Sequence, residues 1–260
     1  MVGINMSREE KYNLLKCLLD MGEMLLESGA EISRVEDTIV RMGHAYGAVR
    51  TEVFVITSIL SLTMEFGDGY VATETRRSVN EVNTDFRRIE SINAISRECC
   101  ADLMTLNELR RRVDQAAEGS KSYAAILTGS VLAAASFAMF FGGTAEDAAI
   151  AGILAIGICI LQKYLSRTKV RIMESNLLVS LMLGLSAGVF SVVLPSLHMD
   201  KILIGDIMLL IPGLQMTNSI RNMLVGDTIS GIVRLTESLM WAVAIACGIM
   251  VSLAVISRIK

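Results

Sequence analysis

The sequence predicts an α+β N-terminal domain, with helices flanking a small β meander, followed by an α-helical transmembrane bundle of four to five spans. Hydrophobic residues make up 52% of the 260 residues and the mean hydropathy is +0.52, which is too apolar for an ordinary soluble domain. Residues 1–121 carry 15 Lys/Arg and 20 Asp/Glu, whereas residues 122–260 carry 9 and 7. We therefore predict a cytoplasmic domain over residues 1–121 and a transmembrane domain over residues 122–260.

The composition argues against several classes of function. A pI near 5.5, with the excess acid in the polar half, is the opposite of the clustered Lys/Arg surface that binds nucleic acid. The cysteines lack CxxC spacing and the two histidines stand apart, so we expect no metal site, no disulfide framework and no cofactor. Adjacent Cys99 and Cys100 are interpreted as structural thiols in a reducing compartment rather than as a redox pair.

Two amphipathic helices are predicted at the start of the chain. Apolar residues recur at helical spacing over residues 7–29 and again from residue 32 to about residue 46. The polar side of the second helix carries charges of both signs three or four residues apart: Glu31, Arg34, Asp37 and Arg41. This spacing favours a solvated ladder of ion pairs, with a functional role as the alternative.

A β-hairpin or three-stranded meander is predicted next. Leu60, Leu62 and Met64 alternate with polar residues before a Gly-Asp-Gly turn at residues 67–69. Helical spacing then returns after Asn80 and ends at three consecutive arginines, residues 110–112. Because these arginines precede the first apolar run, the positive-inside rule places the N-terminal domain in the cytoplasm.

Three membrane spans are predicted from apolar runs at residues 123–141, 147–165 and 176–194. The connection after the second run is basic, which agrees with a cytoplasmic N-terminal domain; its cations are Lys163, Arg167, Lys169 and Arg171. Small residues at four-residue spacing predict close helix packing. They are Ala125, Gly129 and Ala133 in the first run, and Ser180, Gly184 and Gly188 in the third.

The last part of the chain predicts a broken or re-entrant segment near residues 211–227. Pro212 removes a backbone donor and Gly213 adds conformational freedom. A full crossing gives five spans and a re-entrant segment gives four. Ionisable and polar residues stand in this apolar sequence: Asp206, Gln215, Asn218, Arg221, Asp227, Arg234 and Glu237. We favour a water-filled cavity for them, with an interfacial turn from residue 218 to residue 234 as the alternative.

Two stretches resemble signatures of a known family. LLESGAEISRVEDTIVRMGHAYG, followed by the strand pair and TRRSV, is similar to the N-terminal signature of the threonine/serine exporter family. IPGLQMTNSIRNMLVGDTISGIVRLTES is similar to the membrane signature of that family. The resemblance covers nearly the whole chain, which looks like the larger subunit of a split, two-protein exporter. It implies a small second membrane subunit as partner, a homo- or hetero-oligomer, a small-molecule substrate, and the lipid bilayer as the surroundings of the protein.

The resemblance assigns residues to the two signatures. The cytoplasmic and strand signatures contain Glu31, Arg34, Val35, Glu36, Thr38, Thr75 and Arg76. The membrane signature contains Pro212, Gly213, Thr217, Asn218, Arg221, Gly226, Asp227, Gly231, Arg234 and Glu237. The segment VITSILSL lacks the Pro expected after its first Thr, so no role is carried over to Thr57 and Ser58.

These residues favour secondary export of a small carboxylate-bearing metabolite across the bacterial inner membrane. The resemblance implies a threonine/serine-like amino acid, or a dicarboxylate such as succinate. We expect Arg221 or Arg234 to pair with the substrate carboxylate, and Asp206, Asp227 or Glu237 to exchange protons. An internal salt bridge such as Arg234 with Glu237 is the structural alternative. ATP-driven transport is disfavoured because no GxxxxGK[ST] loop is present.

Two other functions compete with export. The chain could be a membrane-anchored metabolite sensor or regulatory subunit, which binding of substrate to residues 1–121 alone would favour. A membrane-tethered hydrolase-like enzyme is the weaker alternative. The sequence has no GxSxG elbow, and His44 is the one histidine of the N-terminal domain, so we expect that the protein is not an enzyme.

Overall fold

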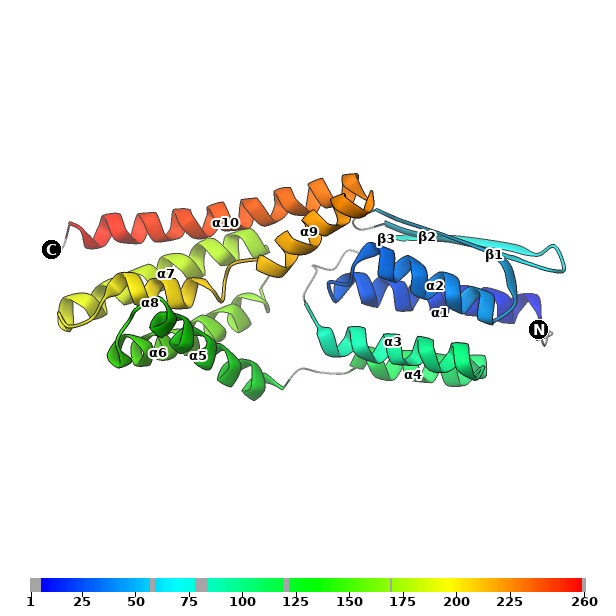
Figure 1. Ribbon diagram of the computed structural model, residues 1–260, viewed down its shortest axis with the longest axis horizontal. Helices are drawn as coiled ribbons and strands as arrows, with labels where there is room; N and C mark the ends of the chain where they lie inside the picture. Colours follow the sequence, from blue (N-terminus) through cyan, green and yellow to red (C-terminus); the bar gives the residue numbers. More distant parts are fainter. Residues whose placement is uncertain (1–5, 57–58, 78–83, 119–121, 169, 259–260) are drawn as a thin grey trace. The chain divides into compact units, whose positions relative to one another are not determined.

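The computed structural model describes residues 6–56, 59–77, 84–118, 122–168 and 170–258. The chain forms two compact units, and Figure 1 labels their helices and strands. The first unit consists of residues 1–120 and 217–234, and the second of residues 121–216 and 235–260. The segment 217–234 thus belongs with the N-terminal residues, which no sequence pattern indicates. The domain boundary at residue 121 stays a prediction.

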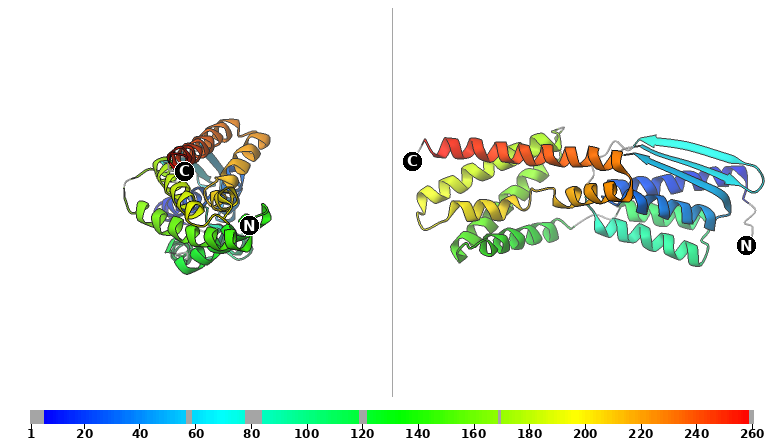
Figure 2. Two further views of the ribbon diagram at one scale, coloured as in Figure 1. Left: turned by 90° about the vertical axis from the view of Figure 1, so that its left-hand side faces the viewer. Right: turned by 45° about the horizontal axis from the view of Figure 1, so that its top comes forward.

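The first unit has three layers (Figures 1 and 2). Its sheet has the order β1-β2-β3, with antiparallel neighbours, and this confirms the predicted meander. The sheet lies on one side of α1 and α2, and α3 and α4 lie on the other. The elements are α1 (Arg8–Glu27), α2 (Ile32–Ala45), β1 (Ala48–Ile56), β2 (Ile59–Phe66), β3 (Val71–Arg77), α3 (Phe86–Ala101) and α4 (Leu106–Glu118).

The core of this unit follows from the apolar periodicity. Helix α1 begins at a capping box, in which Ser7 and Glu10 each bond to the other's backbone N–H. Its inner face is fully buried, and Leu60, Leu62 and Met64 of β2 are also buried in the core. Gly22 lets the layers approach, because a Cβ there would lie 2.7 Å from atoms of both Ile39 and Leu60.

The remaining helices are α5 (Tyr123–Phe140), α6 (Ala145–Leu165), α7 (Ile172–Val193), α8 (Met199–Ile207), α9 (Gly213–Val225) and α10 (Thr228–Ile256). Within the described ranges, four of them are long and apolar enough to cross a membrane, namely α5, α6, α7 and α10. The first three coincide with the predicted spans. Helix α8 packs against α5, α6 and α7.

Small residues bring α7 and α10 together, as predicted for the third apolar run (Figure 2). A Cβ on Gly184 would lie 2.7 Å from Cβ of Ser252, and one on Gly248 would lie 2.7 Å from the Leu177 carbonyl oxygen. Gly129 does not take part in such packing among the described residues, because none of their heavy atoms outside its own helix lies within 4 Å of the position of its Cβ. Helix α5 instead approaches α8 at Gly205, whose Cβ would lie 2.6 Å from the Ala134 carbonyl oxygen.

Candidate functional site

The predicted site residues fall into both compact units. Those of the cytoplasmic and strand signatures share the first unit with part of the membrane signature, namely Asn218, Arg221, Asp227 and Arg234. The second unit holds the others, which are Asp206, Pro212, Gly213 and Glu237. The predicted site is therefore described as two sets of residues.

Helix α9 contacts the turn between α1 and α2. Gly29 forms this turn with a φ of +81°, a conformation that favours glycine. The Asn218 side-chain amide donates a hydrogen bond to the Gly29 carbonyl oxygen at 3.3 Å. One turn further along α9, the guanidinium of Arg221 forms an ion pair with the Glu31 carboxylate. The two signatures therefore meet in one contact.

Two acidic side chains also come close in this contact. Burial raises the pKa of Glu36, and the nearby carboxylate of Asp227 raises it further. Asp227 follows Gly226, which ends α9 with a φ of +103°, and its backbone N–H donates to the Asn222 carbonyl oxygen at 2.9 Å. Oδ2 of Asp227 is buried and has no hydrogen-bond partner among the described residues. The contact thus combines an attractive and a repulsive pair.

The predicted ion-pair ladder on α2 is realised only in part. Asp37 and Arg41 form an ion pair one turn apart, as the spacing indicated. The prediction is wrong for Glu31, which pairs with Arg221, a residue 190 positions away in the sequence. Arg34 is exposed on the same helix. The tertiary contact with α9 provides a cation that helical spacing alone does not reveal.

The strand signature lies in a separate network. Nε of Arg76 donates to Glu74 at 3.1 Å, and the same guanidinium pairs with Asp20 of α1, which also binds Arg110 of α4. Thr75 shares a hydroxyl hydrogen bond of 2.8 Å with Ser61 of the neighbouring strand. These contacts join β3 to two helices. The segment at Thr57 and Ser58 lies outside the described residues.

In the second unit, the helical structure is interrupted between the end of α8 and the start of α9. The Ile211 N–H still donates to the Ile207 carbonyl oxygen at 3.0 Å, whereas the carbonyl oxygen of Pro212 accepts from Met216 at the start of α9. Proline removes one backbone donor at this break. Asp206, on α8, is 0% exposed, and neither of its carboxylate oxygens has a hydrogen-bond partner among the described residues. Glu237, on α10, is exposed.

A polar junction that the sequence did not reveal joins the starts of α6 and α8. Asp147 is 0% exposed and accepts hydrogen bonds from Thr144 N–H at 2.8 Å, Thr144 Oγ1 at 2.9 Å and His198 N–H at 2.8 Å. The Nδ1 atom of His198 lies 3.0 Å from the same carboxylate. The sequence signal available was the Thr144-x-x-Asp147 capping pattern, but no sequence rule pairs it with a histidine 51 residues later.

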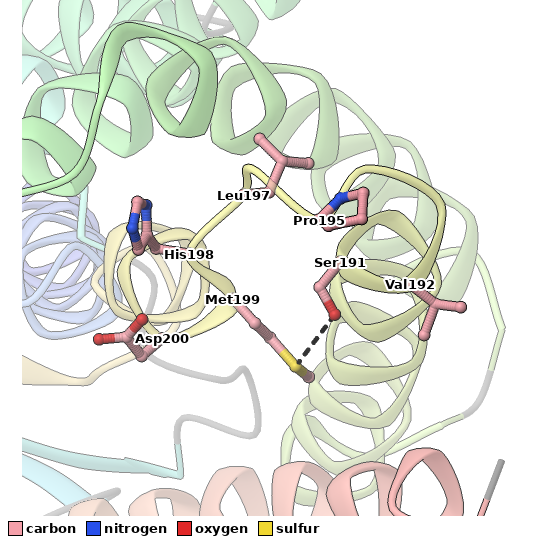
Figure 3. A pocket seen from close by; sticks show the side chains of 7 residues that line it. All are labelled: Ser191, Val192, Pro195, Leu197, His198, Met199 and Asp200. Carbon is pink, nitrogen blue, oxygen red and sulfur yellow. Dashed lines mark hydrogen bonds between the residues drawn. The ribbon is translucent and has the colours of Figure 1, made fainter. Parts of the chain in front are cut away.

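An open pocket of about 540 Å³ lies beside this junction (Figure 3). Its lining comes from the end of α7, the following loop and the start of α8: Ser191, Val192, Pro195, Leu197, His198, Met199 and Asp200. Ser191 Oγ lies 3.9 Å from the Met199 sulfur. Among the residues that the structure describes, no three His, Cys, Asp or Glu side chains gather as a metal site would require.

Comparison with known proteins identifies the family. No curated protein and no solved structure matches the chain. A family model with the description "ThrE: Putative threonine/serine exporter" matches residues 16–256. This match covers the first unit from residue 16 onward and all four long apolar helices. The chain is therefore a multi-pass membrane protein that belongs to the ThrE family of threonine/serine exporters.

Proposed function

We propose that this protein is the larger subunit of a two-protein secondary exporter in the bacterial inner membrane. The observation that carries this proposal is the family match over residues 16–256. The N-terminal domain lies in the cytoplasm, in agreement with the basic residues that precede the first span and follow the second. A small second membrane subunit completes the transport path, and the assembly is an oligomer.

The substrate is a small metabolite that bears a carboxylate. A threonine/serine-like amino acid and a dicarboxylate such as succinate share this group, and an arginine guanidinium binds it with two parallel hydrogen bonds. Arg221 is the cation that we assign to it, because its side chain is 60% exposed and lies at the contact of the two signatures. Arg234, in the first turns of α10, is the second candidate cation.

Proton coupling is assigned to buried carboxyl groups. Ionising an unpaired carboxyl group away from water costs free energy, whereas the protonated acid avoids that cost. Asp206 fits this role because it is fully buried without a hydrogen-bond partner among the described residues. Asp227 is the next candidate, since one of its oxygens is buried and unpaired within the described part of the chain. Glu237 fits less well, because it is exposed.

Metabolite efflux tests the proposal. Cells preloaded with threonine, serine or succinate would express this chain alone, the small membrane subunit alone, or both. We expect efflux only when both are present, and the metabolite that leaves identifies the substrate. Arg221→Ala and Asp227→Ala should abolish efflux while leaving the amount of membrane-inserted protein unchanged. No efflux in any combination would contradict an exporter and favour the sensor or regulatory subunit.

A further inference from the structure

The ion pair between Glu31 and Arg221 holds a carboxylate where the proposed function requires the substrate's carboxylate. Glu31 is 25% exposed and Arg221 is 60% exposed, so the arginine is paired but still reaches solvent. A guanidinium has five N–H donors, and a single carboxylate does not use all of them. A second carboxylate can therefore approach Arg221 before Glu31 has left.

Glu31 is not required to cap its own helix. It occupies the N-cap position of α2, yet its side chain makes no capping hydrogen bond. Its backbone carbonyl oxygen accepts from the N–H groups of Arg34 and Val35 at 3.1 Å, so the helix start is stabilised by the backbone. By contrast, α1 begins with a side-chain cap at Ser7. The Glu31 carboxylate is thus available for exchange without loss of the helix start.

The same contact contains an opposing interaction. The Asp227 carboxylate lies close enough to Glu36 to raise the pKa of Glu36, in addition to the effect of burial. When both carboxyl groups are ionised, their like charges repel each other, which opposes the attraction between Glu31 and Arg221. Because attraction and repulsion partly cancel in this contact, a ligand that binds one of the contacting residues readily shifts the population toward the open contact.

We propose that Glu31 acts as an internal carboxylate that occupies Arg221 in the resting protein, and that the substrate's carboxylate displaces it. This inference rests on the proposed export function, in which Arg221 binds the substrate. Glu31 is then a specificity-determining residue, because a ligand without an anionic group such as a carboxylate cannot take its place. Release of Glu31 removes one of the polar contacts between α9 and the α1–α2 turn, while the hydrogen bond from Asn218 to Gly29 is another.

This exchange predicts that the wild-type protein binds substrate more weakly than a protein without the internal carboxylate. The apparent dissociation constant equals the intrinsic value divided by the fraction of molecules in which Arg221 is free. Glu31→Gln keeps the size of the side chain but removes its charge. We expect this variant to bind the substrate about two- to fivefold more tightly than the wild-type protein. The gain is small because a partly exposed ion pair competes only weakly with the substrate.

The experiment measures binding to the purified full-length chain in lipid nanodiscs by calorimetry. The ligands are L-threonine, succinate and threoninol, an analogue of threonine without a carboxylate. Asp37→Asn is the matched control, because it removes an exposed carboxylate that pairs with Arg41 on the same helix. We expect Glu31→Gln to increase affinity for a carboxylate ligand, Asp37→Asn to leave it unchanged, and threoninol to show no effect of either variant.

Two further variants separate exchange from a structural role. In an Arg221→Gln background, Glu31→Gln should give no gain in affinity, because no guanidinium remains to be freed. The double charge reversal Glu31→Arg with Arg221→Glu restores an ion pair but presents a different arrangement to the ligand. If the pair is purely structural, this reversal should restore both thermal stability and affinity for a carboxylate ligand. If the exchange operates, the reversal should restore thermal stability but not the affinity.

The outcomes for exchange and export are distinct. Efflux by the wild-type protein together with equal or weaker binding by Glu31→Gln would overturn the exchange and leave the exporter intact. Wild-type protein that binds neither L-threonine nor succinate would also overturn the exchange. Lack of efflux with both subunits present would count against the exporter itself, whatever the binding measurements show.

Discussion

Two arginines of the family signatures differ in their surroundings, and this difference decides what each can do. Arg76 is 25% exposed and has the carboxylates of Asp20 and Glu74 as partners, with Glu23 3.9 Å away. Arg221 is 60% exposed and pairs with Glu31. A guanidinium enclosed by carboxylates holds β3 to its neighbours, whereas an exposed one remains accessible to a ligand.

The carboxyl group of Glu36 gives a prediction about pH. Burial and the charge of Asp227 raise the pKa of Glu36 above its ordinary value of 4.5. The folded protein then binds this proton more tightly than the unfolded chain, so the stabilising contribution is fully present below the unfolded pKa and is lost as the pH rises through the folded pKa. We expect Glu36→Gln to raise the thermal unfolding midpoint near neutral pH, with the difference from wild type vanishing in acid.

The measurement is thermal unfolding of the full-length chain in nanodiscs between acidic and neutral pH. Asp227→Asn should raise the midpoint near neutral pH in the same direction but by less, since burial is the larger cause of the shift in pKa. Asp37→Asn is the control, because it removes a carboxylate that is exposed rather than buried. An identical midpoint for Glu36→Gln and wild type near neutral pH would contradict the raised pKa of Glu36 in the folded state.

Helices α7 and α10 show how small side chains set the distance between two elements. Ser180, Gly184 and Gly188 face Gly248, Ser252 and Ile256, and each approach is closer than ordinary Cβ contacts allow. Lipid tails are as apolar as leucine, so helices in a bilayer associate through close packing rather than through the hydrophobic effect. Glycine is needed here because any side chain would meet the opposite helix.

Substitution of Gly184 tests this packing. A Cβ at this position would lie 2.7 Å from Cβ of Ser252, so Gly184→Ala should lower stability by about 1–3 kcal/mol, as overpacking does elsewhere. Ser252→Gly in the same chain should restore part of the loss. Gly157→Ala is the matched control, because no heavy atom of another element in the described part of the chain lies within 4 Å of its Cβ position. Equal unfolding midpoints for the Gly184 and Gly157 variants would contradict the close packing.

At the scale of the whole molecule, the proposed orientation assigns two sets of residues to opposite sides of the membrane. In this proposed orientation, the N-terminal domain and the basic connection between α6 and α7 are assigned to the cytoplasm. The same orientation assigns the loops before α6 and before α8 to the outside, and the bonds between Asp147 and His198 hold these loops together. A carboxylate with several hydrogen-bond donors is well satisfied there despite its burial.

Thiol labelling tests this orientation. Cys100 is exposed, Cys17, Cys99 and Cys159 are buried, and Cys247 is half-buried. We expect a membrane-impermeant maleimide to label Cys100 in inverted vesicles but not in spheroplasts. Because burial raises the pKa of the Cys100 thiol, the reaction is run at mildly alkaline pH, where more thiolate is present.

The opposite side is tested with Asp200→Cys in a Cys100→Ser background, since the Asp200 side chain is 64% exposed. This thiol should react in spheroplasts. Labelling of both positions from the same side would rule out the proposed orientation.

The sequence alone determined the local features of this protein. Apolar periodicity predicted α1, α2 and the meander, the length of apolar runs predicted three spans, and Pro212 predicted the break before α9. Spaced motifs from residue 25 to residue 238 predicted the family. These features depend on neighbours in the chain, where helical, strand and membrane-spanning patterns have fixed periods or lengths.

Which distant residues meet depends on the packing of the folded elements. The contact of Arg221 with Glu31 and that of His198 with Asp147 join segments that no period relates. Likewise, Gly129 and Gly184 are equally small, yet within the described residues another helix lies against Gly184 and none lies against Gly129. A charge or a small side chain indicates that close contact is possible, but the partner is chosen by how the folded elements pack together.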